Sequence, residues 1–257
     1  MTPGHVIWNG SINFGPVAVP VRLLPAVREQ RIQFHLLHRR DLVKLKRQMV
    51  CSLEGAPVPL EDQARGFELE GGKYILVDPA ELEKADPEAS RAIEVHEFVP
   101  AAQIDPVFLE RSYYLEPGPE VAGYNALVAA LSEMGLAGVC TWTMRRRTYV
   151  GALQAGGKIL RLTALRYAGE VVNATGLKAA DAPLSARELK VGTELIQHMS
   201  GRFQPEKFEN RHQVRLQELV DRKARGQKIQ VRRPKRRAAT EPSRLLSVLE
   251  AGLRKVA

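Results

Sequence analysis

Apolar and polar residues alternate along residues 31–50, where the first apolar positions are Ile32, Phe34 and Leu36. The alternation resumes after a charged break at residues 39–41. A period of two residues is typical of extended strands. The stretch is therefore predicted to form two strands joined by a turn, each strand about 26 Å long if it has about eight residues.

The polar positions of this stretch are strongly basic and face a single acid, Asp41. One interpretation is an ordinary hairpin with a solvated basic face, and the other is a basic ribbon lying along nucleic-acid phosphates. His35 and His38 should point to opposite faces, so they suit phosphate contact better than shared metal binding. The basic positions are Arg31, Arg39, Arg40, Lys44, Lys46 and Arg47.

Two strands are predicted before the ribbon, at residues 6–12 and 17–24, with one face of the second strand formed by valines and a leucine. Pro16, Pro20 and Pro25 cannot donate hydrogen bonds to a neighbouring strand. The second strand is therefore expected at an edge or an opening of its sheet.

The middle of the chain predicts a barrel-like core. A strand at 73–77 leads into a short helix that starts at Asp78-Pro79 with Glu81 as a capping-box acid. Strands at 93–99 and 112–115 follow, then a helix with Tyr124, Leu127, Val128 and Leu131 on one face and Gly135 as its cap. Three alternating segments come next, at 137–144, 149–154 and 159–167, and such short strands around one or two helices favour a barrel.

The first two of these segments are separated by Arg145, Arg146 and Arg147. A triple arginine at a strand junction is compatible with a solvated loop. Because the chain contains a second basic element, the ribbon, phosphate contact is the favoured interpretation.

The last third of the chain changes character. Ser185 with Glu188, and Asn210 with Gln213, predict two capped helices with too little apolar surface to form a separate domain. These helices should pack on the barrel or on another subunit. A run without acids follows, and it predicts a disordered tail that binds DNA through Arg232, Arg233, Lys235, Arg236 and Arg237.

An apolar stripe ends the chain, formed by Leu245, Leu246, Leu249 and Leu253. A helix this short is marginal by itself. It is expected to fold into a groove of a partner protein, and the alternative is that it packs back on its own barrel.

The net charge of +9 over 257 residues favours nucleic acid or another anionic surface as partner. No apolar run is long enough to span a bilayer and no leader is recognised, so a cytoplasmic, nucleoid-associated protein is expected. Cys51 and Cys140 fit a reducing compartment. No enzyme motif is found, and the acids at 78–86 fit capping and solvation, so no catalysis, cofactor or metal is expected.

Four segments resemble the Ku family, and in particular its short bacterial members. They are IWNGSINFGPVAVPVRL at Ile7–Leu23, FHLLHRRD at Phe34–Asp41, IDPVFLERSYYLEP at Ile104–Pro117 and FQPEKFENRHQVRLQELVDRK at Phe203–Lys223. The resemblance implies a mixed β/α, mainly β fold: a Ku-type β-barrel core with an extended bridge arm and a C-terminal helical arm, forming a ring-shaped homodimer that threads double-stranded DNA ends. It also implies recruitment of a DNA ligase, ligase D, in non-homologous end joining.

With this resemblance, the expected domains are a barrel core at 1–182 with its arm at about 31–72, a helical arm at 183–225 and a basic tail at 226–257. Many bacterial relatives carry C-x-x-C in the bridge, but here Cys51 is followed three residues later by Glu54, so no metal is expected. The ligase-binding residues are expected to be the four leucines of the tail. The alternative function is a general nucleic-acid-binding β-barrel protein without dependence on ends.

Overall fold

The computed structural model describes residues 5–177, 185–226 and 250–251. The chain divides into two compact units. One contains residues up to 29 together with 35–173, and the other contains 30–34 together with the chain from 174 onward. The tail residues Arg232–Arg237 and the leucines at 245, 246, 249 and 253 lie outside the described residues.

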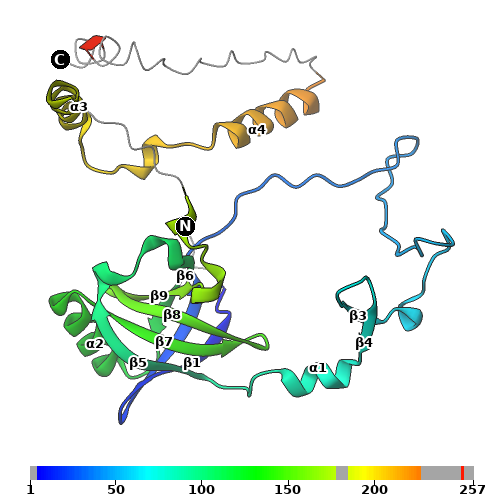
Figure 1. Ribbon diagram of the computed structural model, residues 1–257, viewed down its shortest axis with the longest axis horizontal. Coiled ribbons are helices and arrows are strands. Elements are labelled where there is room, and N and C mark those ends of the chain that lie inside the picture. The colour runs from blue at the N-terminus through cyan, green and yellow to red at the C-terminus, as the bar shows by residue number, and fades with distance from the viewer. Residues whose placement is uncertain (1–4, 178–184, 227–249, 252–257) are drawn as a thin grey trace. The chain divides into compact units, whose positions relative to one another are not determined.

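The first unit contains a closed barrel of seven strands in the order β1-β2-β6-β9-β8-β7-β5 (Figure 1). Neighbouring strands pair antiparallel except at the closure, where β1 and β5 run parallel and Ile12 pairs with Ile93. The strands are β1 (Trp8–Phe14), β2 (Val17–Pro25), β5 (Ala92–Pro100), β6 (Leu109–Pro117), β7 (Leu136–Met144), β8 (Arg147–Gly156) and β9 (Ile159–Leu165).

Alternation along these strands fills the barrel, because every second side chain points inward. The interior is lined by Ile12, Leu23, Leu115, Leu160 and Leu162, which have no exposed surface.

Helix α2 (Val121–Met134) contacts β2, β7 and β8. Since β2 and β8 lie on opposite sides of the barrel, the helix covers one of its ends. Its buried face consists of the four residues expected from the sequence, Tyr124, Leu127, Val128 and Leu131, and it ends at Gly135 with φ +64°. Both predictions for this helix are confirmed.

Tyr124 joins the helix to the barrel through its hydroxyl group. The backbone N–H of Leu160 donates to the Tyr124 hydroxyl at 2.8 Å, and the hydroxyl donates to the carbonyl of Leu115. Leu115 and Leu160 are partners in the β6–β9 pairing. The phenol thus bridges a pair of backbone groups at the end of this ladder. Burial raises the pKa of Tyr124, so its hydroxyl stays protonated.

The predicted edge position of β2 is wrong, because β2 lies between β1 and β6. Pro20 is tolerated there because its backbone nitrogen and carbonyl face the point where β6 ends. The Pro20 carbonyl accepts from the N–H of Gly118 at 2.8 Å, one residue past the last β6 residue. The missing N–H of Pro20 therefore removes no bond from a continuing ladder.

The chain between β2 and β5, residues 26–91, contributes no strand to the barrel and is termed the arm. It contains a two-stranded sheet, β3 (Arg65–Glu68) with β4 (Tyr74–Val77), and helix α1 (Pro79–Ala85). The α1 prediction is confirmed, and Glu81 Oε2 accepts from the Asp78 N–H at 2.9 Å. The sequence analysis predicted no strand at the position of β3.

The two predicted strands within residues 31–50 are not formed, which is a second correction. Only an isolated bridge between Leu37 and Lys44 forms beside the turn, and another joins Val50 to Pro57. A two-stranded ribbon without a third strand or a covering layer gains little from packing. The regular alternation therefore gives an extended chain with local pairing.

The second unit contains α3 (Ala186–Met199) and α4 (Arg211–Ala224), and the predicted caps are confirmed. The Glu188 N–H donates to Ser185 Oγ at 3.2 Å, and the Gln213 N–H donates to Asn210 Oδ1 at 3.1 Å. Neither helix has a buried residue. Short 3-10 helices occur at Leu60–Asp62, Ala101–Gln103, Pro106–Phe108, Ala168–Glu170, Ala174–Gly176 and Pro205–Lys207. None of the helices in the described part of the chain is both long and apolar enough to cross a membrane.

Candidate nucleic-acid interface

A tight turn at residues 39–41 forms the tip of the basic stretch. Asp41 organises it: its Oδ1 atom lies 2.9 Å from His38 Nδ1 and accepts from the Val43 N–H at 3.1 Å. Leu42 takes a left-handed conformation, with φ +60°. Asp41, the only acid of the stretch, thus contacts groups of the turn itself and does not neutralise the lysines that follow.

The pairing beside this turn separates the two faces of the chain. The His38 N–H donates to the Val43 carbonyl at 2.8 Å, and the Leu45 N–H donates to the Leu36 carbonyl at 2.9 Å. Paired residues share a face, so Leu36 and Leu45 lie together, while Lys44 lies with Leu37 on the other side. One face here therefore carries Leu36 and Leu45, and Lys44 shares the other face with Leu37.

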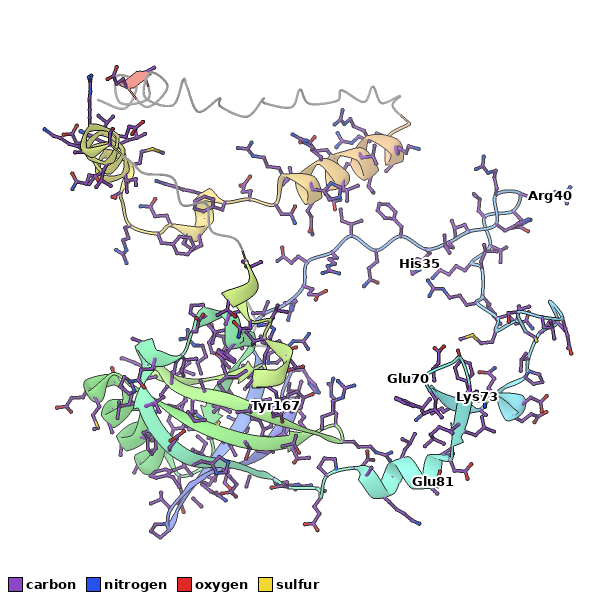
Figure 2. All side chains as sticks on the ribbon, viewed as in Figure 1. His35, Arg40, Glu70, Lys73, Glu81 and Tyr167 are labelled. Atoms are coloured by element: carbon purple, nitrogen blue, oxygen red, sulfur yellow. The ribbon has the colours of Figure 1, made fainter. Side chains whose placement is uncertain are left out.

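Both faces are open to solvent. Leu36 is 67% exposed and Leu45 is 55% exposed. Every basic residue expected in the ribbon is exposed as well, and Figure 2 shows His35 and Arg40 on this part of the chain. The exposed predicted residues are Arg31, His35, His38, Arg39, Arg40, Lys44, Lys46 and Arg47; Arg31 belongs to the second unit and the others to the first.

The three consecutive arginines of the β7–β8 connection do not form one cluster. Met144 pairs with Arg147, which is already part of β8, so the turn contains only two residues. Arg145 and Arg146 have φ values of +51° and +62°, as a tight two-residue hairpin turn requires. Such conformations normally favour glycine or asparagine.

Arg146 reaches helix α1. Its Nη1 atom lies 3.5 Å from Glu83 Oε1 and 3.3 Å from Asp86 Oδ2. The sequence assigned these acids to capping and solvation and did not connect them with the arginine. A phosphate that contacts Arg146 must compete with two carboxylates, whereas Arg145 and Arg147 form no ion pair with a described residue.

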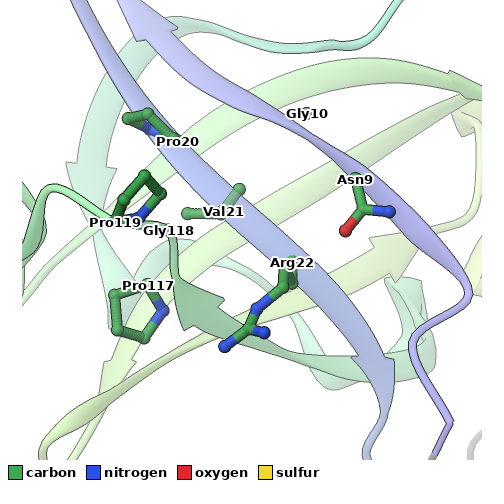
Figure 3. Close-up of a pocket in the computed structure, with 8 residues that line it drawn as sticks. All are labelled: Asn9, Gly10, Pro20, Val21, Arg22, Pro117, Gly118 and Pro119. Carbon is green, nitrogen blue, oxygen red and sulfur yellow. The ribbon is translucent and has the colours of Figure 1, made fainter.

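A groove of about 480 Å³ lies between β1, β2 and the end of β6 (Figure 3). Pro20, Pro117 and Pro119 form much of its wall. Gly118 is required there, because a Cβ atom at this position would lie 2.7 Å from Pro20 Cβ. Beside the groove, Arg22 Nη2 pairs with Glu116 Oε2 at 3.2 Å.

The two cysteines occupy different environments. Cys140 is buried, and desolvation raises its thiol pKa to about 12. Cys51 lies in a turn of the arm, where the backbone N–H groups of Glu54 and Leu53 lower its pKa. In the described residues, no three histidine, cysteine or acidic side chains gather in a way that could hold a metal ion.

One contact involves the end of the chain. Arg187 Nη2 on α3 lies 3.0 Å from Glu250 Oε1. Glu250 thus contacts helix α3 of the second unit, to which it also belongs.

Sequence comparisons agree with this architecture. Residues 13–191 match the Ku70/Ku80 beta-barrel domain. A protein from Geotalea uraniireducens named non-homologous end joining protein Ku 2 is 56% identical over 254 residues, which cover 99% of each chain. Proteins named non-homologous end joining protein Ku from Anaeromyxobacter sp. and Mycobacterium tuberculosis are 36% and 32% identical; the matches cover 88% and 97% of this chain and 77% and 95% of those relatives. The profile match covers most of the barrel and the whole arm, and so this chain belongs to the Ku family.

Proposed function

We propose that a homodimer of this chain binds the ends of double-stranded DNA without regard to sequence and acts in non-homologous end joining. The observation that carries the proposal is the arm: its basic side chains are exposed and, apart from the turn pair of His38 with Asp41, those from 35 to 47 form no ion pair with a described residue. The names of its relatives support the same process.

The basic groups favour phosphate contact over base reading. They stand on extended chain and turns, and no described helix carries a pattern for entry into the major groove. Phosphate contacts supply affinity without sequence information. A protein that accepts any broken end needs this kind of contact.

Dimerisation is supported by apolar surface that no described part of the chain covers. Exposed apolar patches of this extent mark interaction sites. The arm exposes Phe34, Leu36, Leu37, Leu42, Val43, Leu45, Met49, Val50, Phe67, Tyr74, Ile75 and Leu76. Helices α3 and α4 add Leu189, Ile196, Met199 and Val214. A second copy of the chain is the proposed cover, and a ring around DNA is the proposed assembly. Light scattering should give twice the chain mass at micromolar concentration, and a monomer with intact DNA binding would contradict the dimer.

The protein acts by binding and recruitment, not by catalysis. The basic tail adds affinity for DNA, and its leucines bind the end-joining ligase. The protein works in the cytoplasm, at the nucleoid.

The deciding experiment compares linear duplex with covalently closed circular DNA of equal length and sequence. End-dependent binding should give strong retention of the linear form and little of the circle. Linear DNA with both ends closed by hairpin loops is the matched control, because it has the same contour but no open end. Equal binding to all three forms would favour the general nucleic-acid-binding barrel instead.

A further inference from the structure

A second polar site lies on the barrel itself. It is a cavity of about 360 Å³ formed by β6, β8, β9 and the turn after β9. Tyr167, in that turn, is labelled in Figure 2. The lining residues are Glu110, Arg111, Tyr113, Arg147, Thr148, Tyr149, Ala164, Leu165, Tyr167 and Glu170.

Strand register explains why a cavity remains here. Ala164 pairs with Arg111 on one side and with Gly151 on the other, so the centre of this row carries only a methyl group. On the neighbouring rows, Tyr113 and Tyr149 are large. The Trp142 ring fills the space beside Gly151. Because paired residues share a face, the two tyrosines and Arg111 border the space that remains beside Ala164.

The walls are held by contacts of their own. The Tyr149 ring stacks on Trp142, with the ring centres 5.2 Å apart. The Tyr167 hydroxyl donates to the Thr148 carbonyl at 3.0 Å, and the Tyr167 N–H donates to Glu170 Oε2 at 2.7 Å. The cavity is therefore preformed, which lowers the entropy cost of binding a ligand.

The groups that line it suit a phosphorylated ligand with an aromatic part. Arg111 and Arg147 supply guanidinium donors, the residue type that matches phosphate oxygens best. Burial raises the pKa of Tyr113, against the opposing effect of Arg111, so the phenol stays a neutral donor. Glu170 already accepts a hydrogen bond from the Tyr167 N–H, which leaves Glu110 as an acceptor for an amino or hydroxyl group of the ligand.

We propose that this cavity binds a nucleoside phosphate, with the phosphate held by Arg111 and Arg147 and the base placed against the rings of Tyr149 and Tyr167, since Tyr113 is buried. Tyrosine faces bind bases of any identity by stacking. A volume of about 360 Å³ is at the small end of ligand sites, as expected for a single nucleotide. The nucleotide can be free in solution or can be the 5′-phosphorylated terminal residue of a DNA end; only the second source rests on the proposed function.

The first test needs no DNA. Calorimetry on the full chain compares deoxyadenosine 5′-monophosphate, deoxyadenosine and inorganic phosphate. The monophosphate should bind at least tenfold more tightly than either fragment. Arg111→Gln and Arg147→Gln should each weaken monophosphate binding about tenfold. The control, Arg161→Gln, removes the same charge from β9 and should not weaken it, because Arg161 lies outside the cavity and donates to Gln154 at 3.1 Å.

The second test identifies the source. Duplexes closed by a hairpin at one end carry either a 5′-phosphate or a 5′-hydroxyl at the open end. A several-fold preference for the phosphate that disappears in Arg111→Gln assigns the site to DNA ends, and nucleotide binding without such a preference assigns it to free nucleotides. The preference is the ratio of the affinities for the two duplexes. A general loss of DNA affinity in Arg147→Gln lowers both affinities alike, so the ratio can still be interpreted.

Absence of monophosphate binding by the wild-type chain would overturn the site. Wild-type affinity for the monophosphate in both arginine variants would overturn it as well. Equal binding of inorganic phosphate and the monophosphate would overturn the role of the tyrosines. Failure of both duplexes to bind would refute the proposed function but leave the calorimetry as a test of the cavity. Thermal unfolding of each variant checks its fold, and Arg111→Gln and Arg147→Gln provide independent tests.

Discussion

Replacing Lys44 and Lys46 with glutamine tests whether the arm contacts phosphates. Neither lysine forms an ion pair with a described residue, and the same holds for Arg47. Counting only these three cations after the turn, the proposed homodimer would offer six groups for phosphates. Neutralising about six phosphates gives a slope near −5 for log affinity against log salt.

The double variant leaves two of these groups in the dimer, so the slope should fall to about −2. Between 50 and 200 mM salt, the wild type should lose about a thousandfold in affinity and the variant only about tenfold. The measurement is fluorescence anisotropy on a short duplex with one open end, over at least four salt concentrations.

The matched control is Arg22→Gln with Arg161→Gln, which also lowers the charge by two per chain. Both side chains are engaged on the barrel, Arg22 with Glu116 at 3.2 Å and Arg161 with Gln154 at 3.1 Å. The control should keep the wild-type slope. An unchanged slope in the lysine variant, or equal flattening in the control, would refute phosphate contact by the arm.

Four further predictions concern stability and the tail. Tyr124→Phe leaves the Leu160 N–H and the Leu115 carbonyl without the bridging hydroxyl and should lower the free energy of unfolding by about 2 kcal/mol in denaturant titrations, while Tyr114→Phe, at an exposed position, should be neutral. Because burial raises the pKa of Tyr124 in the folded state, stability should also fall as pH rises above the ordinary tyrosine pKa of about 10, with a shallower fall in Tyr124→Phe. Gly135→Ala forces a Cβ into φ +64° and should lower the melting temperature through a loss of about 1 kcal/mol, whereas Gly169→Ala, which has no positive φ, should not. Truncation after Thr240 should leave dimerisation and DNA binding nearly unchanged and abolish ligase stimulation; a truncated chain that is less stable but still recruits ligase would show that the tail belongs to the fold.

Local rules were sufficient wherever a few neighbouring residues decide the conformation. The caps at Ser185 and Asn210 form as expected, because a side-chain oxygen satisfies an N–H that the helix leaves free. Gly135 ends α2 because a left-handed residue without a Cβ is needed there. The three-strand meander also follows from its alternation.

Alternation alone did not decide whether a strand forms. Residues 31–50 show the same period as β7–β9, yet they form only two isolated bridges, Leu37 with Lys44 and Val50 with Pro57. In the barrel, each alternating segment has a neighbour on both sides and an apolar interior. Residues 31–50 of the arm have neither, so the alternation there does not produce a sheet.

Tertiary structure decided which distant residues meet. The position of Pro20 between two strands depends on where β6 stops, and the carboxylate partners of Arg146 come from a helix about sixty residues earlier in the chain. The cavity beside Ala164 exists because the register places this small residue next to Arg111, with Tyr113 and Tyr149 on the neighbouring rows. Barrel closure sets these registers through pairings as distant as Ile12 with Ile93, and no local sequence pattern encodes them.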